Sequence, residues 1–133
     1  MYPGDLYYSE SHQWARVEDD GMATVGITHY AQEQLGDLVY VELPRPDDEA
    51  HRGEPLGSVE SVKAVADVNS PVSGRVVEVN TTLDDEPERI NQDCYGGGWL
   101  AKIDLSDPAE IRSLMNAQQY VQFVKQLTDQ KAG

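Results

Sequence analysis

The chain has 133 residues, and its 24 acidic side chains against 10 basic ones give a formal net charge of −14. A surface of that sign repels phosphate backbones and anionic membranes, which argues against a nucleic-acid-binding or lipid-surface role. The length fits one hydrophobic core, so we expect a single domain over residues 1–133, with a core over about residues 6–128 and flexible ends. The acidic surface fits plain solubility and also complementarity to basic patches on partner proteins.

Cys94 is the only cysteine, so the chain has no internal disulfide and is compatible with a reducing compartment. Its surroundings look polar and offer no cationic activation, which favours an incidental thiol in a loop. No apolar run approaches the length of a membrane span, and the first residues resemble neither a secretory signal nor a transit peptide. We therefore expect a cytoplasmic protein.

Strands and one short helix are predicted in the first third of the chain. Residues 13–18 and 22–27 are β-prone runs on either side of an Asp-Asp-Gly turn. Thr28 is placed to cap a short helix, and Gly36 is placed to end it.

The next strand is predicted over residues 38–43, where alternation places Val39, Val41 and Leu43 on one face. Residues 44–55 follow with three prolines and several acidic residues. Because proline and charge disfavour a central strand, we expect a solvated loop there.

Lys63 occupies the most informative position in the sequence. Two β-prone runs, residues 56–62 and 65–68, meet at this lysine, which predicts a hairpin with Lys63 at its tip. A lysine at a tip projects a flexible stem and a primary amine into solvent. That geometry suits an enzyme-made amide carrying a prosthetic arm, although it also suits a merely solvated charge.

A further strand is predicted over residues 75–80, with Arg75, Val77 and Val79 on the face opposite Val76. This strand follows a proline and a glycine, which are typical of a turn.

The C-terminal third predicts one strand and two helices. Trp99, Ala101 and Ile103 share one face of a late strand. Asp107 is followed by a proline and, three residues on, by a glutamate, the pattern of a capped helix start. Asn116 is placed to cap a final helix. The sum of short strands with helices at the rim predicts a β-rich α+β domain, either a compact sandwich or a flattened barrel.

Motifs for self-sufficient catalysis are absent from the sequence. The three histidines have no metal-type spacing, and no Gly-x-Ser-x-Gly elbow is present. The glycine run 96–98 is followed by Trp-Leu, where a phosphate loop needs Gly-Lys-Ser/Thr. We therefore predict that the chain is not an enzyme and that any reactive group is attached to it.

Several segments, in order, resemble one known family, the H protein of the glycine cleavage system. The resemblance runs from about Tyr8 to Phe123. Its segments are Ser11-His12-Gln13-Trp14 and residues 23–28, 31–44, 59–64, 70–74, 76–80, 90–93 and 95–100.

The resemblance implies a lipoyl-domain-like barrel-sandwich hybrid, built of two antiparallel sheets with short peripheral and C-terminal helices. It implies lipoate in amide linkage to Lys63. It also implies a shuttle that carries an aminomethyl group from glycine decarboxylase (P protein) to an aminomethyltransferase (T protein), and dithiol electrons to dihydrolipoyl dehydrogenase (L protein). Lipoate-attaching enzymes are implied as further partners.

The same resemblance places Ser11, Gln13 and Asp67 at a cleft that shields the loaded arm. Glu60 and Asp67 flank Lys63, and we expect them to contribute to recognition around the arm. Where this chain has Gln13, the family usually has glutamate. The amide keeps an acceptor but loses the charge, and charge-assisted hydrogen bonds are roughly twice as strong as neutral ones.

Three other interpretations remain open at this point. The chain could be a scaffold on which lipoate is assembled before relay to 2-oxo acid dehydrogenases, since that role uses the same Lys63. A biotin carrier is disfavoured, because its motif flanks the lysine with methionines and this chain has Val62 and Ala64. The third interpretation is an unmodified acidic interaction module.

Overall fold

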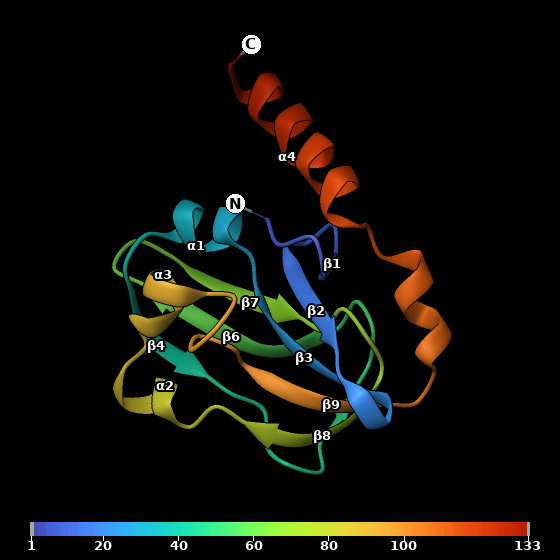
Figure 1. The fold of residues 1–133 in the computed structure, drawn as a ribbon. Coiled ribbons are helices and arrows are strands. Elements are labelled where there is room, and N and C mark those ends of the chain that lie inside the picture. The colour runs from blue at the N-terminus through green and yellow to red at the C-terminus, as the bar shows by residue number, and fades with distance from the viewer. Residues whose placement is uncertain (1, 133) are drawn as a thin grey trace.

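The chain folds as two antiparallel β-sheets packed together, and the computed structural model describes residues 2–132, with side chains to residue 128 (Figure 1). The expectation of flexible ends includes Met1 and Gly133. These two residues lie outside the described residues. The larger sheet has the order β1-β2-β3-β9-β8-β5 and the smaller one the order β4-β6-β7. The larger sheet consists of β1 (Tyr7–Tyr8), β2 (Gln13–Val17), β3 (Met22–Ile27), β9 (Ala101–Leu105), β8 (Gly74–Val79) and β5 (Glu49–Ala50). The smaller sheet consists of β4 (Leu38–Glu42), β6 (Pro55–Ser61) and β7 (Val65–Asn69).

Helices lie at the rim of the two sheets. They are α1 (His29–Leu35), α2 (Thr82–Asp85), α3 (Arg89–Asp93) and α4 (Ala117–Ala132), with 3-10 turns at η1 (Asp19–Gly21) and η2 (Pro108–Ser113). The C-terminal part of α4 projects away from the sandwich (Figure 1). This arrangement confirms the predicted fold class, with two antiparallel sheets that do not close into a barrel.

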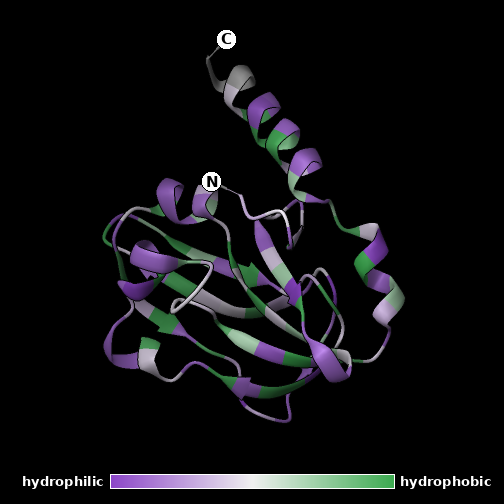
Figure 2. Ribbon diagram, in the orientation of Figure 1, coloured by the Kyte–Doolittle hydropathy of each residue, from purple (hydrophilic) through white to green (hydrophobic). Residues whose placement is uncertain are grey.

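Hydrophobic residues recur along the strands, whereas α1 and α3 are largely hydrophilic (Figure 2). One buried cluster joins the smaller sheet to the peripheral helices and contains Ile27, Leu38, Val41, Val59, Val68, Leu83, Ile90, Cys94 and Leu100. A second cluster lies on the larger sheet and contains Ala15, Val25, Ala50, Val72, Val76, Ala101, Ile103 and Ile111. Burial of these groups supplies the main favourable term in folding.

An aromatic cluster fixes the N-terminal strands and α4 to each other. The rings of Tyr8 and Tyr120 stack with their centroids 4.7 Å apart, and both side chains are fully buried. The Trp14 indole lies across Gly26, where an added Cβ would come within 2.7 Å of the ring. Its Nε1 donates to the carbonyl of Cys94 at 3.0 Å. Gly26 is therefore required for the close approach of this indole to β3.

Most of the predicted local elements are confirmed. The Oγ1 of Thr28 accepts a hydrogen bond from the amide of Ala31, and Gly36 ends α1 with a φ of +83°. The side chain of Asp107 caps η2, although the segment forms 3-10 geometry rather than an α-helix. The Oδ1 of Asn116 accepts from an amide in the first turn of α4 at 2.8 Å.

The predicted faces of β4 are wrong because the strand contains a bulge. Its pairing with β6 shifts register between Leu38 and Tyr40. A bulge inserts one residue and breaks the two-residue side-chain period. As a result Leu38 and Val41 are buried, whereas Val39 is 50% exposed instead of sharing a buried face with Val41.

The predicted faces of β8 are wrong for the same reason. Its pairing with β9 shifts between Val76 and Glu78. Val79 therefore packs against the cluster that contains Val76, although strict alternation placed it with Arg75 and Val77.

Residues 44–55 are exposed along most of their length, but they are more than the solvated loop that we expected. They contain β5, which pairs with β8 at the edge of the larger sheet. Ala50 in this strand is buried. The pattern missed β5 and the equally short β1, since two residues carry no measurable alternation.

Candidate functional site

The predicted hairpin is confirmed, with Lys63 in the turn between β6 and β7. The amide of Ser61 donates to the carbonyl of Ala64 at 2.8 Å. The buried Ser61 Oγ accepts from the amides of Lys63 at 3.2 Å and Ala64 at 3.1 Å. A serine hydroxyl that bonds nearby amides stabilises a turn. The backbone of the turn is thus held while the side chains of Val62, Lys63 and Ala64 are exposed.

The stem of Lys63 passes beside the C-terminal end of α1. Its Cε lies 3.7 Å from the point that a Cβ on Gly36 would occupy. Gly36 has a φ of +83°, a conformation that side-chain-bearing residues rarely adopt. The lysine stem therefore lies next to backbone that carries no side chain.

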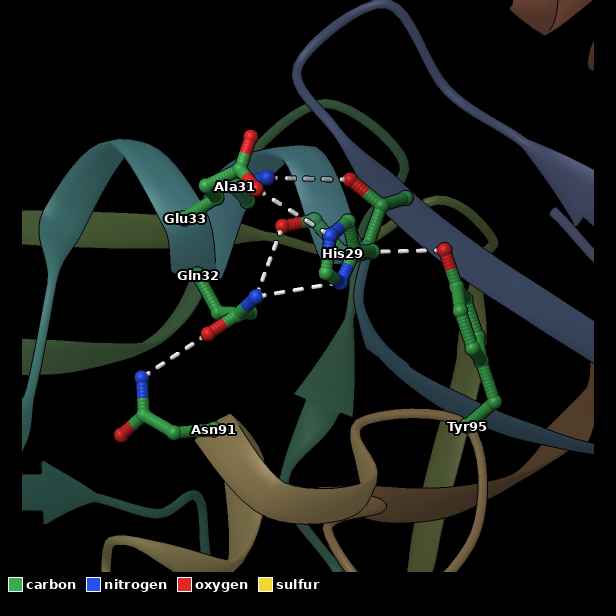
Figure 3. A network of polar contacts seen from close by, with 7 residues as sticks. His29, Ala31, Gln32, Glu33, Asn91 and Tyr95 are labelled. Atoms are coloured by element: carbon green, nitrogen blue, oxygen red, sulfur yellow. Dashed lines mark hydrogen bonds and ion pairs between the residues drawn. The ribbon is translucent and has the colours of Figure 1, made fainter. Parts of the chain in front are cut away.

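Asn91 on α3 fixes this turn through three hydrogen bonds, of which Figure 3 shows the one to Gln32. Its Nδ2 donates to the Oε1 of Gln32 and to the carbonyl of Gly36, each at 2.9 Å. Its Oδ1 accepts from the amide of Leu38 at 2.9 Å. One amide side chain thus satisfies backbone groups on both sides of the turn that flanks Lys63.

The N-terminal end of α1 is held by a second set of contacts in the same network (Figure 3). The amide of His29 donates to the hydroxyl of Tyr95 at 2.9 Å. The Nε2 of Gln32 donates to the carbonyl of His29 at 3.1 Å. Both ends of α1 are therefore anchored to the segment formed by α3 and the residues after it.

A cleft of about 330 Å³ lies beside the hairpin, between α1, the edge strand β7 and the start of β2. Ser11, Gln13 and Asp67 all line it, so the structure brings together three residues that the sequence analysis assigned to one site. Its remaining lining is mostly apolar or aromatic and consists of His12, Ile27, Tyr30, Ala31, Gln34, Leu35, Val59, Ala66 and Val68. The cleft therefore combines an apolar wall with a few polar groups, as small-molecule sites commonly do.

The Gln13 side chain is buried and already hydrogen-bonded, with 3% of its surface exposed. Its Oε1 accepts from the hydroxyls of Ser9 and Ser11, each at 2.6 Å. Its Nε2 donates to the carbonyl of Ser11 at 2.8 Å. His12 between them adopts a φ of +74°, which closes the turn. Gln13 thus organises the Ser9–Gln13 turn at the end of the cleft.

The wall formed by His12 is connected to α4. The Nδ1 of His12 lies 2.8 Å from the hydroxyl of Tyr120, which also lies 2.7 Å from the Oγ1 of Thr28. Burial raises the pKa of the Tyr120 phenol well above its ordinary value, so the hydroxyl stays neutral. Phe123 adds a ring contact to His12 at 5.9 Å. The sequence predicted a final helix capped by Asn116 but not this contact, because no local pattern pairs residues 108 positions apart.

Glu60 and Asp67 do not occupy the same position around Lys63. Asp67 lies opposite Ser58 in the pairing of β6 with β7, and Glu60 lies opposite Val65. Both carboxylates are exposed, but only Asp67 lines the cleft. Glu60 lies on the face of the smaller sheet opposite the buried Val59.

Cys94 corrects one expectation. It is 6% exposed and packs in the cluster with Ile90 and Leu38, not in a polar loop. Burial raises the pKa of its thiol to about 11. A neutral buried thiol behaves as a small apolar side chain.

Among the described residues, no group of three or more histidine, cysteine, aspartate or glutamate side chains is placed to hold a metal ion. The described helices include none with the length and apolar character required to span a bilayer.

The fold and this site define a class of protein: a small β-sandwich domain that presents one lysine on a hairpin next to a largely apolar cleft. The sequence profile of the family described as Glycine cleavage H-protein matches residues 6–127. The chain belongs to the glycine cleavage H-protein family. Members of this family are carrier components of a multienzyme system, so the chain is not an enzyme by itself.

Individual relatives agree with this assignment. The glycine cleavage system H protein of Marinobacter nauticus is 52% identical over 122 residues, which cover 92% of this chain and 94% of the relative. The glycine cleavage system H protein 4 of Aquifex aeolicus is 51% identical over 131 residues, covering 98% of this chain and 76% of the relative. A crystal structure of a glycine cleavage system H protein from Mycobacterium marinum matches with a TM-score of 0.83 and 40% identity, covering 95% of this chain and 98% of that one.

Proposed function

We propose that Lys63 carries lipoate in amide linkage and that the chain is the lipoyl shuttle of a cytoplasmic glycine cleavage system. The observation that carries the proposal is the exposed lysine in a serine-braced turn beside a cleft that also contains Ser11, Gln13 and Asp67. Family membership and bacterial relatives support the proposal.

Attachment needs an accessible amine and an activated lipoyl donor. The unprotonated Nζ of Lys63 attacks the acyl carbonyl and the new C–N bond forms. The activating group then leaves with its bonding electron pair, and the nitrogen gives up a proton. The chain contributes a turn whose backbone is held by Ser61 and whose lysine projects outward.

The cleft fits a lipoyl arm in its chemical character. The apolar wall, which includes Leu35, Val59 and Ala66, suits an aliphatic stem. When bound, the lipoyl disulfide supplies group-carrying and redox chemistry that the chain itself lacks. Ser11 and Asp67 are the polar residues that we assign to the carried end of the arm.

The first experiment locates the attached group. Apo-protein is incubated with a bacterial lipoate-attaching enzyme, lipoate and ATP, and its intact mass and peptide map are recorded. We expect a gain of one lipoyl group on Lys63, no gain in Lys63→Arg, and a normal gain in the control Lys102→Arg. A lipoyl group on Lys102, Lys125 or Lys131 would overturn the assignment.

The second experiment separates the shuttle from the relay role. Lipoylated protein is mixed with purified glycine decarboxylase, aminomethyltransferase and dihydrolipoyl dehydrogenase, and glycine-dependent NADH formation is followed. We expect turnover that depends on the lipoylated chain. No turnover, together with transfer of lipoate to a 2-oxo acid dehydrogenase domain, would favour the scaffold.

A third experiment addresses the cleft. We propose that Asp67 accepts a hydrogen bond from the carried amine, so Asp67→Asn speeds its loss from the loaded protein. Gln13→Glu slows the loss by adding a charge next to Ser11, since hydrogen bonds to charged groups contribute about 1.5–3 kcal/mol and less in an open cleft. Mass spectrometry at fixed pH gives the half-lives. Identical half-lives for wild type and both variants would contradict the assignment.

A further inference from the structure

Three side chains form a hydrogen-bond series that joins α4 to the wall of the cleft. The Nδ1 of His12 lies 2.8 Å from the hydroxyl oxygen of Tyr120, and this oxygen lies 2.7 Å from the Oγ1 of Thr28. Thr28 and Tyr120 are fully buried, whereas His12 lines the cleft. The amide of Thr28 also donates to the carbonyl of His12 at 3.1 Å. Because buried hydroxyl hydrogens need acceptors, these contacts decide where each hydrogen of the series lies.

The hydroxyl of Thr28 sets the direction of the series. Its oxygen already accepts a hydrogen bond from the amide of Ala31 at 3.2 Å. Its hydrogen needs an acceptor, and among the contacts of this hydroxyl with described residues only the oxygen of Tyr120 can provide one. Thr28 therefore donates to Tyr120. The hydrogen of the Tyr120 hydroxyl is then directed to the Nδ1 of His12, which is the other contact of that hydroxyl.

Tyr120 keeps the hydrogen that this direction requires. Burial raises the pKa of its phenol well above the ordinary value, and the hydrogen bond from Thr28 offsets only part of that effect. The phenol is therefore neutral and donates to the Nδ1 of His12. An imidazole whose Nδ1 accepts a hydrogen bond carries its proton on Nε2. The contacts thus assign His12 as the neutral Nε2–H tautomer.

The other protonation forms of His12 leave a buried hydroxyl hydrogen without an acceptor. An imidazolium, or a neutral ring protonated on Nδ1, presents a hydrogen to the oxygen of Tyr120. Tyr120 must then donate to Thr28, and the hydrogen of the Thr28 hydroxyl loses its acceptor. A buried group left unsatisfied costs its full desolvation penalty. The series therefore favours one form of the imidazole over both others.

The other titratable groups around the imidazole do not outweigh this preference. On α1, the ring centroid of Tyr30 lies 4.6 Å from that of His12. On α4, Phe123 adds an apolar ring next to Tyr120. On β7, Asp67 lines the same cleft and would favour an imidazolium. Its carboxylate is exposed, however, so water and salt screen this attraction, whereas the hydrogen bond between Tyr120 and Thr28 is buried.

The form of His12 decides the charge of the cleft. Among the described residues that line it, His12 is the only one that can become a cation, and Asp67 is the only carboxylate. Gln13 adds no charge. With a neutral imidazole the lining carries one negative charge, which attracts an ammonium group. With an imidazolium the two charges would cancel, and the attraction for an ammonium group would be lost.

We propose that Tyr120 is a positioning residue that holds His12 as the neutral Nε2–H imidazole, so that the cleft presents one unopposed carboxylate and selects a cationic carried group. The inference rests on the proposed function, which supplies the carried amine, and adds the contact that keeps its site free of positive charge. It also gives α4 a part in the site, although none of the described residues that line the cleft belongs to α4.

The first test determines the form of His12 by heteronuclear NMR of the imidazole nitrogens in the protein without lipoate. Spectra are recorded at about pH 7 and about pH 6, because an ordinary histidine with a pKa of about 6.5 is mainly protonated at the lower value. We expect His12 to stay in the Nε2–H form at both values, whereas a histidine-containing control peptide gains a proton. An Nδ1–H tautomer, or an imidazolium at either pH, would overturn the proposal.

The second test compares two variants that each lose one buried hydroxyl. Tyr120→Phe removes the hydroxyl next to His12, and Tyr8→Phe removes that of the stacked ring, which donates to the carbonyl of Pro3 at 2.7 Å. Both lipoylated variants are loaded with the amine by glycine decarboxylase, and its loss is followed by mass spectrometry at the same two pH values. At the lower pH we expect Tyr120→Phe to lose the amine about threefold faster than Tyr8→Phe, an effect of the size of one exposed charge pair.

The outcomes separate this inference from the proposed function. Equal rates of amine loss for the two variants at both pH values would overturn the role of Tyr120 and leave the carrier function intact. Failure of Lys63 to accept lipoate would overturn the carrier function without changing the spectrum of His12. Thermal melting verifies that each variant is folded. If Tyr120→Phe does not fold, the spectrum of the wild-type protein decides the proposal alone.

Discussion

Similar side chains are buried on the larger sheet and exposed on the smaller one. On the larger sheet Tyr8 and Trp14 are fully buried: Tyr8 stacks on Tyr120 of α4, and Trp14 belongs to the same hydrophobic cluster. On the smaller sheet Tyr40 and Val65 stay exposed beside Lys63. Aromatic and β-branched residues are the ones that strands favour, so the strands alone do not account for the difference. What differs is whether another element covers the sheet.

Because of this difference, we expect the buried side chains to contribute to folding stability and the exposed ones to partner binding. A buried aromatic residue contributes its full transfer free energy and its packing contacts, whereas an exposed one contributes little to folding. Substitutions on the larger sheet should therefore change the free energy of unfolding. Substitutions at the hairpin should change partner binding and leave the free energy of unfolding almost intact.

The largest expected effect is that of Trp14→Ala. Removing this fully buried indole from its place over Gly26 leaves a cavity and removes the hydrogen bond to the carbonyl of Cys94. We expect a loss of about 3–5 kcal/mol in the free energy of unfolding, measured by urea titration. Val65→Ala is the matched control on the smaller sheet, and an equal loss there would contradict the comparison.

Asn91→Ala should have the next largest effect. It removes three hydrogen bonds that hold the turn at Gly36, each contributing about 0.5–1.5 kcal/mol. We expect a loss of about 2–3 kcal/mol in the free energy of unfolding. Gln92→Ala on the same helix is the control, because Gln92 is exposed. A wild-type melting temperature for Asn91→Ala would mean that the network contributes nothing to stability.

Tyr120→Phe compares the two sheets by removing one oxygen atom from a buried tyrosine. The ring stays in its stack with Tyr8, but the hydroxyl contacts to His12 and Thr28 are lost. A lost buried hydrogen bond should cost about 1–2 kcal/mol in the free energy of unfolding. Tyr40→Phe removes a hydroxyl from an exposed tyrosine and should cost nothing measurable. Equal melting temperatures for the two variants would show that α4 is held by ring packing alone.

Lys63→Arg should have the smallest effect on folding. The side chain is exposed in a turn whose backbone is braced by Ser61, so we expect a change within about 0.5 kcal/mol. The same variant should accept no lipoate. A large loss of stability would mean that the lysine stem beside Gly36 is part of the core packing, and the loss of attachment would then need a different control.

The local sequence alone predicted a large part of the fold. The caps at Thr28, Asp107 and Asn116 and the hairpin around Lys63 depend on residues within a few positions of each other. Such signals stay readable because capping and turn formation act over three or four residues. The motifs also indicated the family to which the chain belongs. The resemblance placed Ser11, Gln13 and Asp67 at one cleft, and all three line the same cleft in the structure.

Only the tertiary structure decided the features that depend on distant partners. The bulges in β4 and β8 arise from pairing with β6 and β9, so alternation within each strand assigned Val39 and Val79 to the wrong faces. Cys94 is buried because it packs in one cluster with residues of the smaller sheet and α3, although its sequence neighbours are polar. Tyr120 reaches His12 across 108 residues. Sequence patterns report short-range preferences, whereas burial and register are set by what the rest of the chain places on each surface.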